Sequence, residues 1–331
     1  MKDNSISVII PVYNAEKNIK NCIQGLLSQT VPPNQIILIN DGSNDNSLRI
    51  MEEFLPSPII EIYNQRNEGV SKARNIGLSH INSKYVAFVD SDDLVKKDYL
   101  EILLHGYDYV NTDLSISGIS YEDANGTKLY SDYKTGMYSS FEILRSLFYE
   151  NGHKGYLWNK LWKTNIIKKF NLRLDETISM AEDLLFLVEY LQHSNKVYVS
   201  NQPTYVYKTT ENSLSSQIRL EKFDNRFIKT NEDFLYVCTK VIDYLPKDDA
   251  NILIDAYAFR GRTAANFLRQ LRLYNKVENI DLQRKISKLC SKSKHDVNLT
   301  KTMSVKNKLG FFLTLYLPNV MLLLDKKRFK R

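Results

Sequence analysis

The sequence predicts an α/β fold in which a mostly parallel β-sheet is flanked by helices. Short apolar segments rich in Ile and Val alternate with segments that carry an apolar residue at every third or fourth position. The connections between them are short, as in a series of right-handed β-α-β units. Polar residues follow several of the apolar segments directly, at the edge where such sheets bind their ligands.

The first 54 residues contain two strand–helix pairs. Residues 6–12 are apolar on both faces, as a central parallel strand should be. A helix is expected over 15–29, where apolar residues recur with helical spacing until a Pro-Pro pair follows. A second strand is expected over 35–39 and a second helix over 47–54.

The same alternation continues as far as an acidic cluster. Strands are expected over 59–63 and 85–89, with a helix over 70–79 between them. The last of these strands runs directly into Asp90-Ser91-Asp92-Asp93. The cluster should therefore lie at the carboxyl edge of the sheet.

The acidic cluster has the composition of a cation site. Asp90, Asp92 and Asp93 repel one another unless a cation or hydrogen-bond donors compensate. Their oxygens favour Mg²⁺ or Mn²⁺, which bind one or two carboxylates together with substrate phosphates. Tyr13-Asn14 and Asp41 follow other strands of the same sheet, so they should converge with the cluster on one cleft.

Beyond residue 98 the pattern is less regular. A strand is expected over 108–120, a hairpin turn at Asn125-Gly126 and a helix over 140–148. From about residue 220 the chain becomes helical and increasingly basic. Further helices are expected over 223–244, 248–274 and 281–290.

Positive charge is concentrated near one end of the chain. The net charge is +7, but residues 281–331 contain 13 Lys and Arg against 3 Asp, or +10, which leaves −3 for the remainder. Because the bulk of the chain is mildly acidic, a nucleic-acid partner is not expected. Cys22, Cys238 and Cys290 are far apart and lack metal-ligand spacing, which favours a reducing cytoplasm.

Four motifs occur in order within the first 98 residues. They are Ser7-Val-Ile-Ile-Pro-Val-Tyr-Asn14, Asn40-Asp-Gly-Ser43, Gly69-Val-Ser-Lys-Ala-Arg-Asn-Ile-Gly77 and Asp90-Ser-Asp-Asp93. Together they resemble the motifs of family-two glycosyltransferases, which have the Rossmann-like GT-A fold. The resemblance implies an inverting, metal-dependent enzyme of the hexosyltransferase type, which serves bacterial polysaccharide biosynthesis for the cell envelope. It implies a UDP-sugar donor.

The resemblance assigns donor-binding residues by position. Asp41 would accept a hydrogen bond from a uracil-type base, and Arg74 would approach the nucleotide. Asp90 would face the ribose, and Asp92 would bind the Mn²⁺ or Mg²⁺ that bridges the two phosphates, which assists departure of the diphosphate. The other donor-binding positions are Pro11, Val12, Tyr13 and Asn14 at the base pocket and Ser91 in the acidic motif.

A later segment, 205–215, resembles a loop that closes over the donor diphosphate in this family. Lys208 and Ser213 would bind the donor there. Arginine is common in the family where Lys208 stands, and lysine supplies a point charge without the bidentate fork of arginine.

Inverting transfer also requires a base that deprotonates the acceptor hydroxyl. Glu182-Asp183 precedes an apolar helical run, so the residues alone also suit a helix N-terminus with acids placed for the helix dipole. The resemblance implies that Asp183 is the catalytic base and that Glu182 lies on the acceptor side as the alternative base.

Both tryptophans lie in Trp158-Asn-Lys-Leu-Trp162. The resemblance places such a segment upstream of the acid pair, where the aromatic face of Trp158 would bind the acceptor. Packing in the core is the other interpretation of Trp158, and it is the one expected for Trp162.

A mostly apolar stretch over 309–324 is followed by a basic end. About 20 residues are needed to cross a bilayer, and Pro318 interrupts this shorter stretch, so a helix lying in the membrane interface is expected. The basic end would meet anionic lipid on the cytoplasmic face. A helix pair packed on the protein, or an interface with a partner, remains the alternative.

These observations predict a three-part chain. Residues 1–98 would form the nucleotide-sugar half of a GT-A domain, 99–220 its acceptor half, and 221–331 a helical, basic, membrane-associating region. The expected enzyme is cytoplasmic, lies at the inner face of the cell membrane and acts on a glycan or lipid-linked saccharide; self-association remains open. The alternatives are an inactive nucleotide-sugar or glycan binding module and a nucleotidyltransferase, which would usually carry a glycine-rich phosphate loop that this sequence lacks.

Overall fold

The computed structural model describes residues 4–109, 111–123, 126–129, 133–208, 224–274 and 279–329. The chain divides into two compact units. The first comprises residues 1–144, 153–177 and 182–220 and contains the sheet. The second comprises residues 145–152, 178–181 and 221–331 and is mainly helical.

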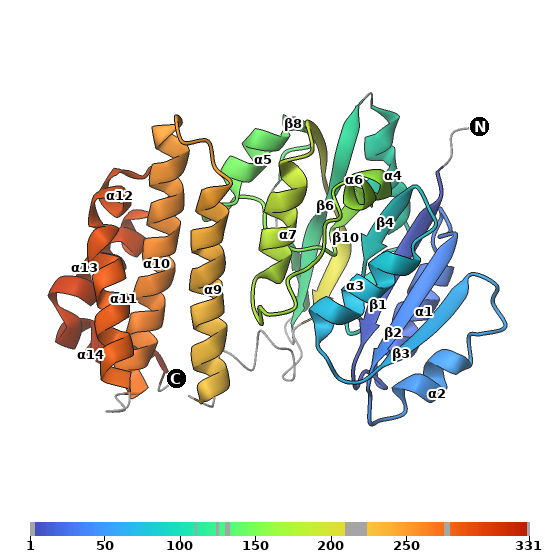
Figure 1. Cartoon of the computed structure of the whole chain (residues 1–331), viewed down its shortest axis with the longest axis horizontal. Helices are drawn as coiled ribbons and strands as arrows, with labels where there is room; N and C mark the ends of the chain where they lie inside the picture. Colours follow the sequence, from blue (N-terminus) through green and yellow to red (C-terminus); the bar gives the residue numbers. More distant parts are fainter. Residues whose placement is uncertain are drawn as a thin grey trace. The chain divides into compact units, whose positions relative to one another are not determined.

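The first unit is built on one mixed sheet with the order β3-β2-β1-β4-β9-β6-β10-β5, with β7 paired to β6 and β8 to β10 (Figure 1). Its strands are β1 (Ile6–Val12), β2 (Gln35–Asp41), β3 (Ile60–Gln65), β4 (Tyr85–Phe88), β5 (Leu94–Val95), β6 (Thr112–Asp123), β7 (Gly126–Leu129), β8 (Gly136–Ser139), β9 (Lys160–Lys163) and β10 (Lys196–Lys208).

The half of the sheet formed by β1 to β4 is parallel, as expected from the alternating pattern. Every residue of β1 and β2 is buried, because both faces of these strands are covered, and most of these residues are accordingly apolar. The other half departs from this pattern. The short strand β9 lies between β4 and β6 and runs antiparallel to both, so the sheet is mixed.

The helices of the first unit connect and cover these strands. They are α1 (Ile19–Leu27), α2 (Ser47–Glu52), α3 (Val70–His80), α4 (Tyr99–His105), α6 (Thr164–Lys169) and α7 (Glu182–Leu191), with a 3₁₀ turn at Gly106–Asp108; α5 (Ser140–Ser146) ends inside the second unit. The helix expected over 15–29 begins only at Ile19. The start of this segment is held by the loop after β2 instead, because the backbone amides of Ala15 and Glu16 donate to Ser47 Oγ (2.8 Å) and Asp45 Oδ2 (3.0 Å).

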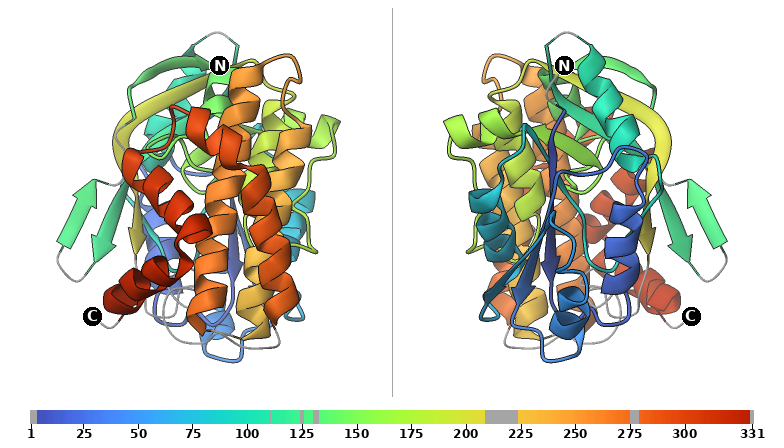
Figure 2. Two further views of the ribbon diagram at one scale, coloured as in Figure 1. Left: turned by 90° about the vertical axis from the view of Figure 1, so that its left-hand side faces the viewer. Right: turned by 90° about the vertical axis from the view of Figure 1, so that its right-hand side faces the viewer.

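The second unit is a group of helices around α10, which contacts each of the others (Figure 2). Its helices are α9 (Asn225–Asp243), α10 (Ala250–Tyr274), α11 (Ile280–Lys292), α12 (Lys294–Leu299), α13 (Val305–Tyr316) and α14 (Pro318–Phe329). The apolar stretch over 309–324, expected as an interfacial helix, belongs to a helix pair that packs on α10, as in the alternative interpretation. Pro318 begins the second helix, because proline has no N–H to continue the first. Among the described residues, no helix is long and apolar enough to cross a bilayer.

Candidate active site

Loops from three parallel strands meet at the carboxyl edge of the sheet. The turn after β1 is tied to the loop after β2, since the backbone N–H of Asn14 donates to Ser43 Oγ (3.1 Å) and Asn14 Oδ1 accepts from the N–H of Asn44 (2.8 Å). Asn14 has φ 48°, a left-handed conformation that Asn tolerates better than most residues. These bonds hold the turn in place beside β2.

Asp41, at the end of β2, holds the start of α3. Its Oδ1 accepts from Gln65 Nε2 (2.6 Å) and the backbone N–H of Glu68 (2.8 Å), and Oδ2 accepts from the N–H of Gly69 (3.0 Å). Each carboxylate oxygen has about two acceptor positions. Oδ2 therefore keeps one position for a further donor, such as the N–H of a base.

The Asp90–Asp93 loop is anchored through Asp93. This side chain is fully buried, and its oxygens accept from Tyr205 Oη (2.8 Å) and from the backbone N–H of Lys208 (3.0 Å) on β10. Tyr205 Oη also accepts from the backbone N–H of Asp90 (3.2 Å). Asp93 thus ties the loop to β10 and leaves Asp90 and Asp92 for other interactions. The sequence did not separate these roles.

Asp92 has the properties of a cation ligand. Burial, and then the charge of Asp90, raise the pKa of Asp92 to about 6. A bound dication would offset both the burial of the charged carboxylate and its repulsion by Asp90. One or two carboxylates together with substrate phosphates are sufficient to bind Mg²⁺ or Mn²⁺. No group of three or more His, Cys, Asp or Glu side chains arranged as metal ligands occurs in the described part of the chain. The residues present thus fit a cation shared with a diphosphate.

Arg74 joins this loop to the acid pair. Its side chain is 8% exposed and donates to Asp90 Oδ1 (2.8 Å) and Glu182 Oε1 (3.0 Å). Burial opposes the charged guanidinium, but Asp90 and then Glu182 outweigh it and raise the pKa of Arg74. Arg74 was expected to approach the nucleotide. In the structure both of its terminal nitrogens already bind carboxylates.

The acid pair forms the first turn of α7. Ala181, just before it, has φ 65°, a strained conformation for alanine that turns the chain into the helix. Burial, and then the charge of Asp183, raise the pKa of Glu182 to about 7. Burial also raises the pKa of Asp183, while Arg74 and Lys160 oppose this increase. Arg74 thus opposes the rise of the pKa for both acids, and Lys160 opposes it for Asp183.

Lys160 is a site residue that the sequence analysis did not single out. It is fully buried, and its ammonium donates to the carbonyl oxygen of Lys154 (3.0 Å) and to Asn159 Oδ1 (2.9 Å), as well as to the carbonyl oxygen of Tyr156. Burial lowers the pKa of Lys160 to about 7, and Asp183 opposes this decrease. The signal available in the sequence was its position in the Trp-Asn-Lys-Leu segment.

Known proteins resemble this chain in sequence. A model of the glycosyl transferase family 2 domain matches residues 7–165. The cholesterol galactosyltransferase of Borreliella burgdorferi is 31% identical over 242 residues, which cover 70% of this chain and 67% of that protein. The chain belongs to glycosyltransferase family 2.

Other relatives of this family-2 chain match it over only part of their own length. The glycosyltransferase GlyA of Streptococcus pneumoniae is 30% identical over 223 residues, or 64% of this chain and 32% of GlyA. The uncharacterized glycosyltransferase EpsJ of Bacillus subtilis is 31% identical over 222 residues, or 63% of this chain and 62% of EpsJ. The chain therefore spans about a third of one relative and less than two thirds of the other.

Solved structures show the same fold as this family-2 chain. TarS 1–349 of S. aureus in complex with UDP-GlcNAc has a TM-score of 0.66 at 21% identity, covering 89% of this chain and 84% of TarS 1–349. The mannosyltransferase PcManGT of Pyrobaculum calidifontis, in complex with GDP-Man and Mn²⁺, has a TM-score of 0.56 at 14% identity, covering 94% and 86%. The fold is thus of the GT-A type.

Within this fold the residues expected to line the base pocket differ in how far their side chains are exposed. Tyr13 is 46% exposed at the edge of the sheet. Val12, in contrast, is fully buried in the hydrophobic core, and Pro11 is buried within β1. Side chains that could reach a base thus come from Tyr13 and Asn14, because alternate residues of a covered strand point into the two packed faces.

Trp158 does not offer a free face in the family-2 chain. It is 6% exposed and stacks on Tyr205 and Tyr156, with ring centroids 4.2 Å and 4.7 Å away. Little of the ring remains for a sugar, so packing accounts for Trp158, and it supports the tyrosine that anchors Asp93. Trp162 is fully buried beside Tyr190.

The remaining expected donor residues lie around the acidic loop or outside the described residues. Ser91 is partly exposed within the loop. Lys208 is also partly exposed, and its backbone N–H is the donor to Asp93. Ser213, like Asn125 of the expected hairpin turn, lies outside the described residues.

Proposed function

We propose that this chain is an inverting, metal-dependent glycosyltransferase that moves a sugar from a UDP-sugar to a glycan or a lipid-linked saccharide. The observation that carries the proposal is the ion-pair bridge of Arg74. It joins Asp90, at the end of β4, to Glu182, which precedes Asp183. A cation-binding loop and a buried carboxylate base are thereby held in one site of the first unit.

The reaction requires one bond to form as another breaks. The acceptor oxygen attacks the anomeric carbon from the face opposite the diphosphate, Asp183 takes the hydroxyl proton, and UDP leaves with the bonding electron pair. A Mn²⁺ or Mg²⁺ bound at Asp92 supplies charge neutralisation for the departing diphosphate. Arg74 and Lys160 keep Asp183 able to accept the proton, because both oppose the rise of its pKa.

The donor assignment rests on the free acceptor position of Asp41 and on the ligands of the solved structures with a similar fold. Asp41 Oδ2 has an acceptor position for the N3–H of uracil, and Tyr13, which follows the neighbouring strand β1, has an exposed ring. The UDP-GlcNAc complex of TarS supports a UDP-sugar, and the complex of PcManGT with GDP-Man and Mn²⁺ supports the use of a divalent cation. The name of the cholesterol galactosyltransferase supports hexosyl transfer and an acceptor with a lipid part.

We place the enzyme in the cytoplasm, at the inner face of the membrane, where it would contribute to polysaccharide for the cell envelope. Cys22, Cys238 and Cys290 are buried and unpaired, as suits a reducing compartment.

Consumption of donor by the purified chain tests the proposal. A panel of nucleotide sugars with Mn²⁺ or Mg²⁺ should reveal a UDP-sugar that releases free UDP. Asp183→Asn should lower the rate by about 10³-fold because the base is lost. Asp92→Asn should raise the cation concentration required, because one hard ligand is lost.

The matched control is Asp281→Asn, whose carboxylate is 95% exposed on α11. This variant should retain the full rate. Donor binding without turnover, unchanged in Asp183→Asn, would favour the inactive binding module instead. Release of pyrophosphate rather than UDP would identify a nucleotidyltransferase.

A further inference from the structure

The pair α13–α14, which we call the hairpin, has one face packed on α10. Phe311, Thr314 and Met321 are buried. Arg269 of α10 forms an ion pair with Asp325, and Arg272 of α10 donates to the carbonyl oxygen of Thr314. These contacts fix which side of the hairpin is turned away from α10.

The other face of the hairpin is apolar and open. Six large side chains along it are each between 45% and 62% exposed. A soluble monomer rarely exposes so many large apolar side chains on two short consecutive helices, and such exposure usually marks an interaction surface. The six are Leu309, Tyr316, Leu317, Val320, Leu323 and Leu324.

The charge around this face has one sign. Residues 300–331 contain eight Lys and Arg and a single acid, Asp325, which is buried and paired with Arg269. The hairpin therefore presents no exposed carboxylate among its described residues. Lys301, Lys306, Lys326 and Lys327 are exposed. A partner with an apolar interior and an anionic surface fits this combination.

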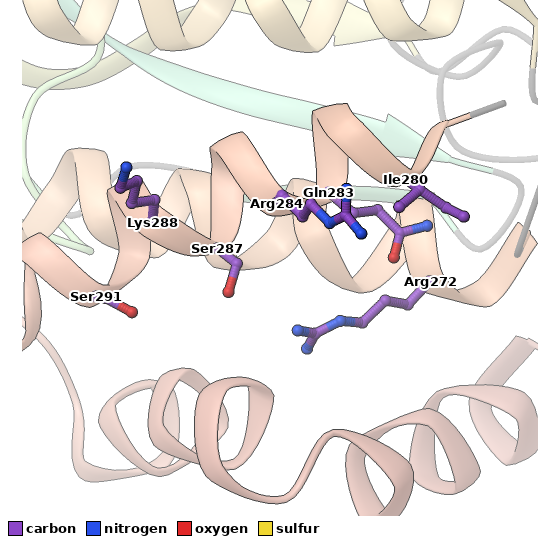
Figure 3. Close-up of a pocket in the computed structure, with 7 residues that line it drawn as sticks. All are labelled: Arg272, Ile280, Gln283, Arg284, Ser287, Lys288 and Ser291. Carbon is purple, nitrogen blue, oxygen red and sulfur yellow. The ribbon is translucent and has the colours of Figure 1, made fainter. Parts of the chain in front are cut away.

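A basic depression that is largely open to solvent, which we call the cavity, adjoins the hairpin. It has a volume of about 570 Å³ and lies between α10 and α11, and Arg272, Arg284 and Lys288 line it together with Gln283, Ser287 and Ser291 (Figure 3). Because Arg272 also donates to Thr314 of α13, the cavity borders the hairpin. Among the described residues no carboxylate forms an ion pair with Arg272, whereas Arg284 pairs with the exposed Asp281. The cavity thus offers cations to an anion.

We propose that the hairpin lies on the surface of a bilayer containing anionic lipid and that the adjoining cavity binds a lipid phosphate. The apolar face enters the region between head groups and acyl chains, and the surrounding lysines meet the anionic head groups. A second copy of the chain is a weaker match, because it would bring the same positive charge to the interface. The proposal does not depend on the transferase activity.

Co-sedimentation of the whole chain with vesicles tests the proposal. The chain should bind vesicles of phosphatidylcholine with phosphatidylglycerol and bind pure phosphatidylcholine far less. Lys326→Ser with Lys327→Ser should weaken binding to anionic vesicles about 30-fold, at about 1 kcal/mol for each lysine. Leu323→Asp with Leu324→Asp should weaken it at least as much, because charges replace the inserted side chains.

Matched controls separate the surface from general effects. Leu55→Asp changes an equally exposed leucine of the first unit and should leave vesicle binding unchanged. Circular dichroism of each variant should match that of the unchanged chain, because the substituted side chains are exposed. Binding should be weaker at about 0.5 M salt, where charges are screened within a few Å.

Three outcomes would overturn the proposal. They are no binding to anionic vesicles, binding that survives both pairs of substitutions, and a dimer of the unchanged chain that the leucine variant converts to a monomer without any vesicle binding. For the cavity, Arg284→Ser with Lys288→Ser should weaken binding to anionic vesicles. Unchanged binding would show that the cavity takes no part in binding the membrane. Competition by soluble glycerol phosphate at low concentration would assign the cavity to a free phosphate compound.

Discussion

At the scale of single residues, Arg74 is where the two halves of the site meet. Its guanidinium is buried and binds Asp90 on one side and Glu182 on the other, 108 positions further along the chain. A buried ion pair contributes little over apolar packing, but removal of one partner leaves an uncompensated charge. Arg74 therefore controls both stability and the position of the acids.

We expect Arg74→Met to lower the free energy of unfolding by about 3 kcal/mol and to abolish transfer, because Asp90 and Glu182 lose their partner. Urea unfolding measures the first effect. The double variant Arg74→Met with Glu182→Gln should recover about 1 kcal/mol or more, because one unpaired carboxylate is removed. Additive losses in the double variant would contradict the role of the bridge.

Lys160 sets the charge around the base. Asp183 is faced by Arg74 from α3, by Lys160 from β9, by Asp90 after β4 and by its neighbour Glu182. Both cations lower the pKa of Asp183, so loss of Lys160 should raise it. In Lys160→Met the acid limb of the kcat/KM profile should therefore move to higher pH, by up to about one unit.

The control for this shift is Lys163→Met, at the other end of β9. Its ammonium is paired with Asp113 (3.0 Å) rather than placed near the base. The control should leave the acid limb where it is. A rate that falls equally at all pH values in Lys160→Met would show that Lys160 has a structural role alone.

At the scale of elements, the first turn of α7 depends on a loop before β9. Lys160 binds the carbonyl oxygens of Lys154 and Tyr156, and so holds the loop around Gly155. A Cβ on Gly155 would lie 2.7 Å from the Cα of Leu184, one residue after Asp183. Only glycine lets this loop approach the backbone of the helix so closely.

Gly155→Ala should push the loop and the first turn of α7 apart. We expect a loss of about 1–3 kcal/mol in the free energy of unfolding and a lower kcat. Gly136→Ala on β8 is the matched control, since its Cβ would meet only Tyr138 at an ordinary 3.8 Å. A Gly155→Ala enzyme with unchanged kcat would contradict this packing argument.

At the scale of the whole molecule, the two units differ in how they are stabilised and in what they offer. The first has a sheet core and carries every residue of the proposed site that the structure describes. The second has helices around α10 and carries the basic, apolar hairpin. The two units also differ in charge, because the excess of Lys and Arg lies in residues 281–331 of the second unit.

The sequence by itself determined the parallel half of the sheet and the motifs after its strands. Local periodicity and short connections are sufficient for the alternating strands and helices from β1 to β4, whereas the pairing of β4 with β1 rather than with β3 was decided by the tertiary structure. The sequence also determined α10 and α11, because the spacing of apolar residues predicts the bounds of both helices to within a few residues.

Only the tertiary structure decided how distant segments combine. It placed β9 antiparallel between β4 and β6, joined Arg74 to Glu182, buried Trp158 in an aromatic stack and gave Asp93 an anchoring role. It also divided the apolar stretch over 309–324 into two helices with one packed face. These outcomes depend on which distant surfaces fit together and on which buried charges find partners, and periodicity along one segment contains neither.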